Sequence, residues 1–157
     1  MTHYLCSTSI SFLLVLLSFQ TTYAETIGQI RPRSGSTSNN TYLWDGKVVK
    51  PRTGAKCETT WSFDGKQIRK RCGFNSSNTY FWNGKTFRPL SGFTGENTGT
   101  WNGTELRRQT GSKSTNIWCF DGHYWSLRQG FTSRNSWVVS GFVPIPVCIL
   151  IILGLNN

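Results

Sequence analysis

Short runs of alternating apolar and polar residues follow one another along residues 35–134, and the pattern repeats every 19 residues. In each unit an aromatic run precedes an Asp-Gly or Asn-Gly step, and aliphatic and basic positions follow, as in YFWNGKTFR at residues 80–88. A fixed short period is typical of one supersecondary unit copied in space, with each copy burying its apolar face on its neighbours. The glycine of this step keeps the period without insertion or deletion, at Gly46, Gly65, Gly84, Gly103 and Gly122.

Each unit is predicted to be a β-hairpin, because Asn-Gly or Asp-Gly between two apolar runs is typical of a two-residue type I′ turn. Both central residues of such a turn need positive φ, so the turn is expected to centre on pairs such as Asn83-Gly84. In the second unit this register places Trp61 opposite Ile68. Continued outward, it places Cys57 opposite Cys72, which predicts a disulfide because opposed residues lie within disulfide reach.

The same register sorts the side chains onto two faces, one aromatic and one basic and polar. We interpret the aromatic residues, such as Trp82, as the core, because nothing else could supply one; a sugar-stacking platform is the alternative. The basic face is a candidate surface for anions, and a solvated face that keeps the protein soluble is the alternative. Its residues are Lys50, Arg52, Arg69, Arg71, Arg88 and Arg107.

The expected fold class is all-β, with tandem 19-residue hairpins stacked as a solenoid-like array. A closed antiparallel meander barrel or a sandwich is the alternative. The expected organisation is a signal peptide at 1–24, a leader at 25–34, a five-repeat β domain at 35–134, and a degenerate sixth repeat with an apolar segment at 135–157.

The signal peptide is predicted from an apolar stretch between Ile10 and Phe19, followed by Thr22-Tyr23-Ala24, a small-x-small cleavage pattern. It predicts a secreted or extracellular protein, with attachment to the cell surface left open. An extracellular compartment also permits the Cys57–Cys72 disulfide.

The C-terminal residues 142–155 are nearly all apolar but are interrupted by Pro144 and Pro146. The segment is too short and too Pro-broken for a typical transmembrane helix. Because Val, Ile and Leu dominate it, we expect a buried strand that caps the apolar face. A membrane anchor and an assembly interface remain alternatives.

Two smaller features of the repeat complete the pattern. The fourth unit is the weakest, since Gly99 stands where other units have an aromatic residue. A column of Asn residues precedes the first strand of most units, and it predicts either a stacked amide ladder or simple turn chemistry. The column is Asn40, Asn78, Asn97, Asn116 and Asn135, with Thr59 in step.

Charge suggests a partner and gives no support for catalysis. Lys and Arg number 17 against 7 Asp and Glu, for a net charge of +10. A basic face can hold a polyanionic partner such as nucleic acid, lipopolysaccharide or an acidic glycan, and a solvated face is the alternative. Turns account for Asp45, Asp64 and Asp121, and no nucleophile or phosphate-binding motif is present. We therefore predict no enzyme, no cofactor and no metal site.

The run from Tyr80 to Pro89, together with the closing Val-Pro-Ile-Pro-Val at 143–147, resembles a family of short secreted bacterial proteins. Its members carry tandem W-[DN]-G-K repeats and a final P-I-P apolar segment. The resemblance implies secretion and fold, and no activity is assigned to that family.

The leading functional hypothesis is a secreted, non-catalytic structural or adhesive repeat protein of the cell surface or extracellular matrix, which self-assembles. The alternative is a soluble binding module for anionic or glycan surfaces. No small-molecule substrate is evident, and membrane association through the C-terminal segment is an alternative to its burial.

Overall fold

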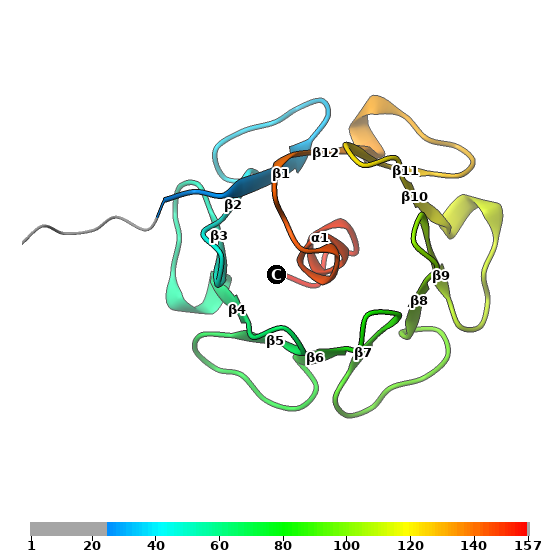
Figure 1. Ribbon diagram of the computed structural model, residues 1–157, viewed down its shortest axis with the longest axis horizontal. Helices are drawn as coiled ribbons and strands as arrows, with labels where there is room; N and C mark the ends of the chain where they lie inside the picture. Colours follow the sequence, from blue (N-terminus) through cyan, green and yellow to red (C-terminus); the bar gives the residue numbers. More distant parts are fainter. Residues whose placement is uncertain (1–24, 157) are drawn as a thin grey trace, which may run out of the picture.

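The computed structural model describes residues 25–156, in which strands form a closed antiparallel barrel around a single α-helix (Figure 1). Each strand pairs with its neighbours in the chain, and the last strand pairs with the first. The strands are β1 (Gly28–Pro32), β2 (Tyr42–Trp44), β3 (Val48–Pro51), β4 (Trp61–Phe63), β5 (Gln67–Lys70), β6 (Thr79–Trp82), β7 (Thr86–Pro89), β8 (Gly99–Trp101), β9 (Glu105–Arg108), β10 (Trp118–Phe120), β11 (Tyr124–Leu127) and β12 (Trp137–Gly141). The helices are α1 (Ile145–Ile152) and three 3₁₀ turns, η1 (Cys57–Thr59), η2 (Ser114–Asn116) and η3 (Ser133–Asn135).

The all-β class and the closed meander barrel, the alternative architecture, are confirmed, and the expected solenoid-like stack is wrong. A stack of hairpins would leave a free strand at each end. Here β12 and β1 meet along five residue pairs, from Gly28–Gly141 to Pro32–Trp137. Closure satisfies the backbone groups that an edge strand would expose.

The sixth hairpin of the barrel is divided between the two ends of the described chain. Strand β12 serves as its first strand and β1 as its second. The sequence IRPR at residues 30–33 corresponds to VKPR at residues 49–52. The segment 25–34, treated as a leader from sequence, therefore contributes a strand of the wall. The expected signal peptide at 1–24 lies outside the described residues.

The hairpin register differs by two residues from the sequence prediction. Phe63 pairs with Ile68, and Trp61 pairs with Lys70 instead of Ile68. The turn glycines have φ between 91° and 107°, while no other residue type in 25–156 has a positive φ. The expected type I′ turn centred on Asp-Gly or Asn-Gly is therefore wrong.

The side chain of the Asp or Asn in each turn accepts hydrogen bonds from the backbone of the turn. Asp64 Oδ1 accepts the backbone N–H groups of Lys66 at 2.9 Å and Gln67 at 2.7 Å. These hydrogen bonds, led by the one from Gln67, hold the pKa of Asp64 below its usual value. The two central residues of the turn are therefore Gly65 and Lys66, and the Asp64 carboxylate satisfies the N–H groups of Lys66 and Gln67.

The aromatic face forms the core, as expected. A shift of two residues in pairing leaves every side chain on its original face, because strands alternate with a period of two. Five tryptophans that point into the barrel are 0–9% exposed. They are Trp44, Trp61, Trp82, Trp101 and Trp125.

The C-terminal segment is buried, but the expected strand is wrong: residues Ile145–Ile152 form α1 inside the barrel (Figure 1). Its residues from Pro146 to Ile152 are all buried. A closed barrel offers no free edge, so a segment inside it must pair its own backbone groups, and a helix does so. In a barrel of about eight strands, the wall's own side chains just fill the interior. A twelve-stranded barrel is wider, so its interior has room for an additional element such as α1.

The helix ends at a glycine. Gly154 has φ 66°, and the N–H of Leu155 donates to the carbonyl of Leu150, which is the Schellman arrangement. Within residues 25–156, no helix combines the length and apolarity that crossing a membrane requires.

Candidate functional site: an outer row of cations

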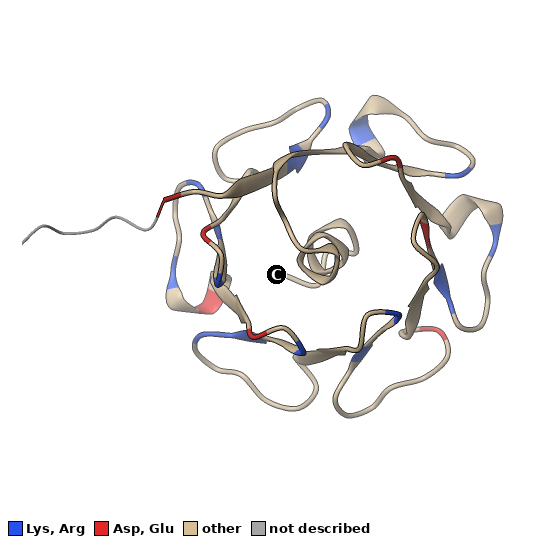
Figure 2. Ribbon diagram, in the orientation of Figure 1, with Lys and Arg blue, Asp and Glu red and all other residues tan. Residues whose placement is uncertain are grey.

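Lys and Arg residues recur on the second strand of successive hairpins around the barrel wall (Figure 2). Each follows an inward-facing residue of the core, as Arg69 follows Ile68. Equivalent positions are two strands apart, on the order of 10 Å. We call this set the outer cation row: Arg31, Lys50, Arg69, Arg88 and Arg107.

Two arginines of the outer cation row rest against phenylalanine rings. The Arg69 guanidinium carbon lies 5.5 Å from the ring centroid of Phe74. That of Arg88 lies 4.3 Å from the centroid of Phe93 and 5.3 Å from that of Phe81. A ring against the guanidinium face leaves the N–H groups at its edge able to donate. Arg88 Nη1 already donates to the Pro89 carbonyl at 3.3 Å, so its other N–H groups are the ones available to an anion.

The remaining two predicted residues, Arg52 and Arg71, lie just beyond the ends of β3 and β5 and are exposed. Arg52 Nη2 donates to Gln29 Oε1 at 2.7 Å. The structure therefore places four of the six predicted residues in one row and two beside it. The sequence interpretation missed Arg31, although its IRPR context matches the second half of the repeat.

One carboxylate reduces the positive charge at one end of the outer cation row. Glu105 accepts hydrogen bonds from Arg107 Nε at 3.0 Å and from Arg128 Nη2. The hydrogen bond from Arg107, followed by that from Arg128, holds the pKa of Glu105 below its usual value. Glu105 is thus ionised at neutral pH, and Arg107 is the least available cation of the row.

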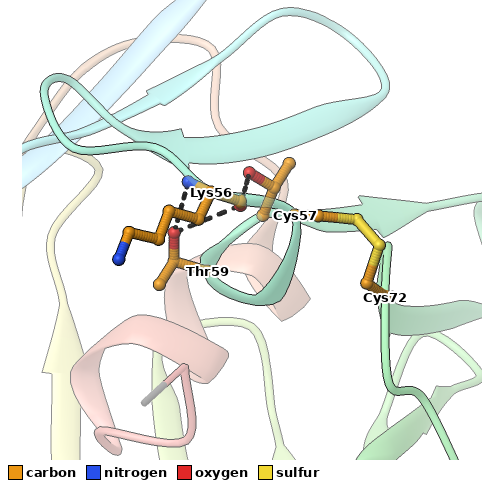
Figure 3. Close-up of a disulfide and its surroundings, with 5 residues drawn as sticks. Lys56, Cys57, Thr59 and Cys72 are labelled. Carbon is orange, nitrogen blue, oxygen red and sulfur yellow. Dashed lines mark hydrogen bonds between the residues drawn. A yellow bond between two sulfur atoms is a disulfide. The ribbon is translucent and has the colours of Figure 1, made fainter.

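The predicted disulfide between Cys57 and Cys72 is confirmed, with the Cα atoms 5.3 Å apart (Figure 3). It joins η1 to the segment after β5, beyond the strand ladder. In the next unit, Ser76 and Ser91 occupy the same two positions, and their hydroxyl groups lie 2.8 Å apart. The disulfide therefore replaces a contact that another loop makes by hydrogen bonding.

The Asn column serves the long loops individually and does not form an amide ladder. Asn78 Oδ1 accepts the N–H of Asn75 at 2.7 Å, and its Nδ2 donates to the carbonyl of Gly73 at 3.0 Å. The other column members make the same pair of bonds, at Asn40, Asn97, Asn116 and Asn135. These paired hydrogen bonds stabilise the conformation of the loops that surround the outer wall.

No protein-family model, curated protein or solved structure matches this chain. The resemblance to secreted bacterial repeat proteins therefore stays a prediction. Within residues 25–156, no three His, Cys, Asp or Glu side chains gather as a metal site would require.

Proposed function

We propose that this protein is a secreted, non-catalytic binding module that attaches to polyanionic surfaces through the outer cation row. The observation that carries the proposal is the regular repetition of cations on the outside of a rigid wall. A row of this kind gives many weak contacts that act together, and each contact releases counterions from the polyanion.

The closed barrel also favours binding over assembly by stacking. The structural hypothesis relied on hairpins that add to one another through open ends. Along residues 25–156 each wall strand is paired on both sides, so the wall offers no free edge for a second copy. A binding surface on a closed wall requires no such edge.

The test is retention on a heparin column of the variant Lys50→Gln/Arg69→Gln/Arg88→Gln. These three residues lie in consecutive hairpins and avoid Arg107, which is paired with Glu105. We expect the salt concentration at elution to fall sharply, and the slope of log affinity against log salt to fall by about three.

The matched control changes Lys47, Lys66 and Lys85 to Gln. These exposed residues have the same period and the same charge but lie at the turns. The control is expected to keep most of the retention and most of the salt slope. Equal losses in the two variants would show that net charge alone governs binding and would contradict a specific role for the outer cation row.

A further inference from the structure

A cavity of about 510 Å³ opens on the barrel beside Gly99 and the residues that follow α1. We call it the Gly99 cavity. Five other hairpins carry an aromatic residue at the position of Gly99, namely Tyr42, Trp61, Tyr80, Trp118 and Trp137. The missing side chain leaves space of the size that small-molecule sites commonly have, about 300–1,000 Å³.

The walls of the Gly99 cavity combine aromatic and aliphatic surface. Tyr80 and Trp118 come from the hairpins on either side, and Leu106 and Leu155 add apolar surface. The Tyr80 ring stacks on Phe87 with 5.1 Å between centroids, which fixes its orientation. Burial raises the pKa of the Tyr80 hydroxyl, so this wall stays uncharged at neutral pH. Such surfaces pack well against the C–H face of a sugar ring.

A buried hydroxyl in the same cavity lacks a partner. Thr98 is 3% exposed and lines the cavity, and its Oγ1 has no hydrogen bond within residues 25–156. Equivalent hydroxyls in four other units each donate to the carbonyl four residues earlier, at 2.6–2.7 Å: Thr41, Thr60, Thr79 and Ser136. Because an unpaired buried polar group is unfavourable, a ligand that hydrogen-bonds to Thr98 gains affinity.

Three charged residues line the Gly99 cavity, namely Glu96, Arg107 and Arg108. Arg107 is paired with Glu105, which leaves two residues of opposite sign. Glu96 and Arg108 are exposed, and neither side chain has a hydrogen-bond or ion-pair partner in the described part of the chain. A carboxylate only accepts hydrogen bonds and a guanidinium only donates them. Neutral hydroxyl groups do both, so they suit this pair better than a ligand of one charge.

We propose that the Gly99 cavity binds one neutral pyranose ring of a glycan, a hexose or an N-acetylhexosamine. The ring packs on Trp118, and its hydroxyl groups meet Thr98, Glu96 and Arg108. The cavity shares Arg107 with the outer cation row, but Lys50, Arg69 and Arg88 do not line it. Sugar binding can therefore be tested independently of polyanion binding.

The first test fills the cavity with Gly99→Tyr, which gives the fourth hairpin the residue that the third has at Tyr80. An added Cβ would lie 2.8 Å from Leu106 Cδ1, the mobile end of a side chain that can rotate away. We expect the melting temperature to stay the same or rise. Binding of cellotriose and chitotriose, measured by calorimetry, is expected to weaken at least tenfold, with heparin retention unchanged.

A second pair of variants separates binding from folding. Thr98→Val removes the unpaired hydroxyl, so affinity should fall about tenfold without a lower melting temperature. Thr79→Val is the matched control: it loses the 2.7 Å bond to the Asn75 carbonyl. The control should melt earlier and bind the sugars normally. This pair also decides the matter if Gly99→Tyr does not fold.

Three results would overturn the proposal. One is the absence of binding of both neutral trisaccharides to the unmodified protein at millimolar concentration. Another is equal binding by Thr98→Val and the unmodified protein. The third is binding of an acidic hyaluronan tetrasaccharide alone. None of these results bears on heparin retention through the outer cation row, so failure here is distinguishable from failure of the proposed function.

Discussion

The inner and outer surfaces of the barrel wall come from alternate residues of the same strands, yet they have opposite properties. Ile68 is fully buried against the interior, while its neighbour Arg69 is exposed outside. The inner positions hold large apolar side chains in most hairpins; the exceptions are Gly99, its partner Arg108, and Lys70, which pairs with Trp61. The outer positions vary more freely, as at Ser126, which stands in step with the cations. Stability should therefore depend on the inner surface, and binding on the outer one.

Helix α1 fills the space that the inner surface of the wall encloses. Val147, Cys148, Ile149 and Leu150 are all 0% exposed, although they point in different directions around one helix. A helix that is apolar on all sides is typical of a completely enclosed position. The wall and the helix thus form a single core.

The largest effect is expected for Trp125→Ala. The Trp125 ring is 0% exposed and lies 4.8 Å from the Phe120 ring and 5.3 Å from the Trp101 ring, between centroids. The free energy of unfolding should fall by ~3–5 kcal/mol, because the change leaves a large cavity. The adjacent outward residue provides the control: Ser126→Ala should change the free energy of unfolding by less than ~0.5 kcal/mol. Denaturant unfolding measures both, and similar losses would contradict the comparison.

The next largest loss of stability is expected from removing the Cys57–Cys72 disulfide, which is the one disulfide among the described residues. Replacing Cys57 and Cys72 by Ser should reduce the free energy of unfolding by ~3 kcal/mol on the chain-entropy model. The fold should survive, because Ser76 and Ser91 occupy these positions in the next unit. Thermal melts with circular dichroism test this. A variant that loses its β spectrum at 25 °C would show that the outer loops support the barrel more than we infer.

A smaller effect is expected at the turns. Gly84 has φ 91° and no atom near its missing Cβ, so strain alone penalises a side chain there. Gly84→Val should reduce the free energy of unfolding by ~1–3 kcal/mol. Gly92 has φ 63°, within the left-handed region that Asn tolerates, so Gly92→Asn should lose less. Urea unfolding of both variants checks the order, and a larger loss for Gly92→Asn would contradict it.

The sequence predicted the hairpins and the two faces because both depend on local periodicity. The disulfide was predicted correctly from a register that is wrong, since Cys57 and Cys72 join segments beyond the strand ladder. Face assignment survived an incorrect register, since pairing shifted by two residues keeps Trp61 inside and Arg69 outside. The stacking of hairpins was not predictable in the same way, because closure depends on small twists accumulated over the whole ring. Strand β1 was missed because it is half of a repeat whose other half lies more than 100 residues away.

The C-terminal segment shows that β propensity alone does not determine secondary structure. Its Val, Ile and Leu residues favour a strand, but inside a closed barrel no strand partner is available, so tertiary context selects a helix. The Gly99 cavity had a signal in the sequence, the missing aromatic residue. The unpaired Thr98 had none, since Thr98 follows the same repeat pattern as Thr79.

The two free cysteines of the described chain offer the most sensitive probe of inside against outside. Cys119 is half-buried on the outer face of β10, and Cys148 is buried in α1. Burial, followed by the charge of Glu105, raises the pKa of Cys119. Burial raises the pKa of Cys148 to about 12. Because the thiolate is the reactive form, both should react slowly, and Cys148 far more slowly.

The last prediction uses this difference in a full-length chain that carries Cys6→Ser. Iodoacetamide at pH 8 should modify Cys119 in the folded protein and leave Cys148 intact, and both should react in denaturant; mass spectrometry counts the modified thiols. Between pH 9 and about 12 the unfolded chain releases the Cys148 proton while the folded chain keeps it. The free energy of unfolding should therefore fall across this range, and Cys148→Ala should lessen the fall. Rapid native alkylation of Cys148 would place α1 outside the barrel and remove the basis for treating the wall and the helix as one core.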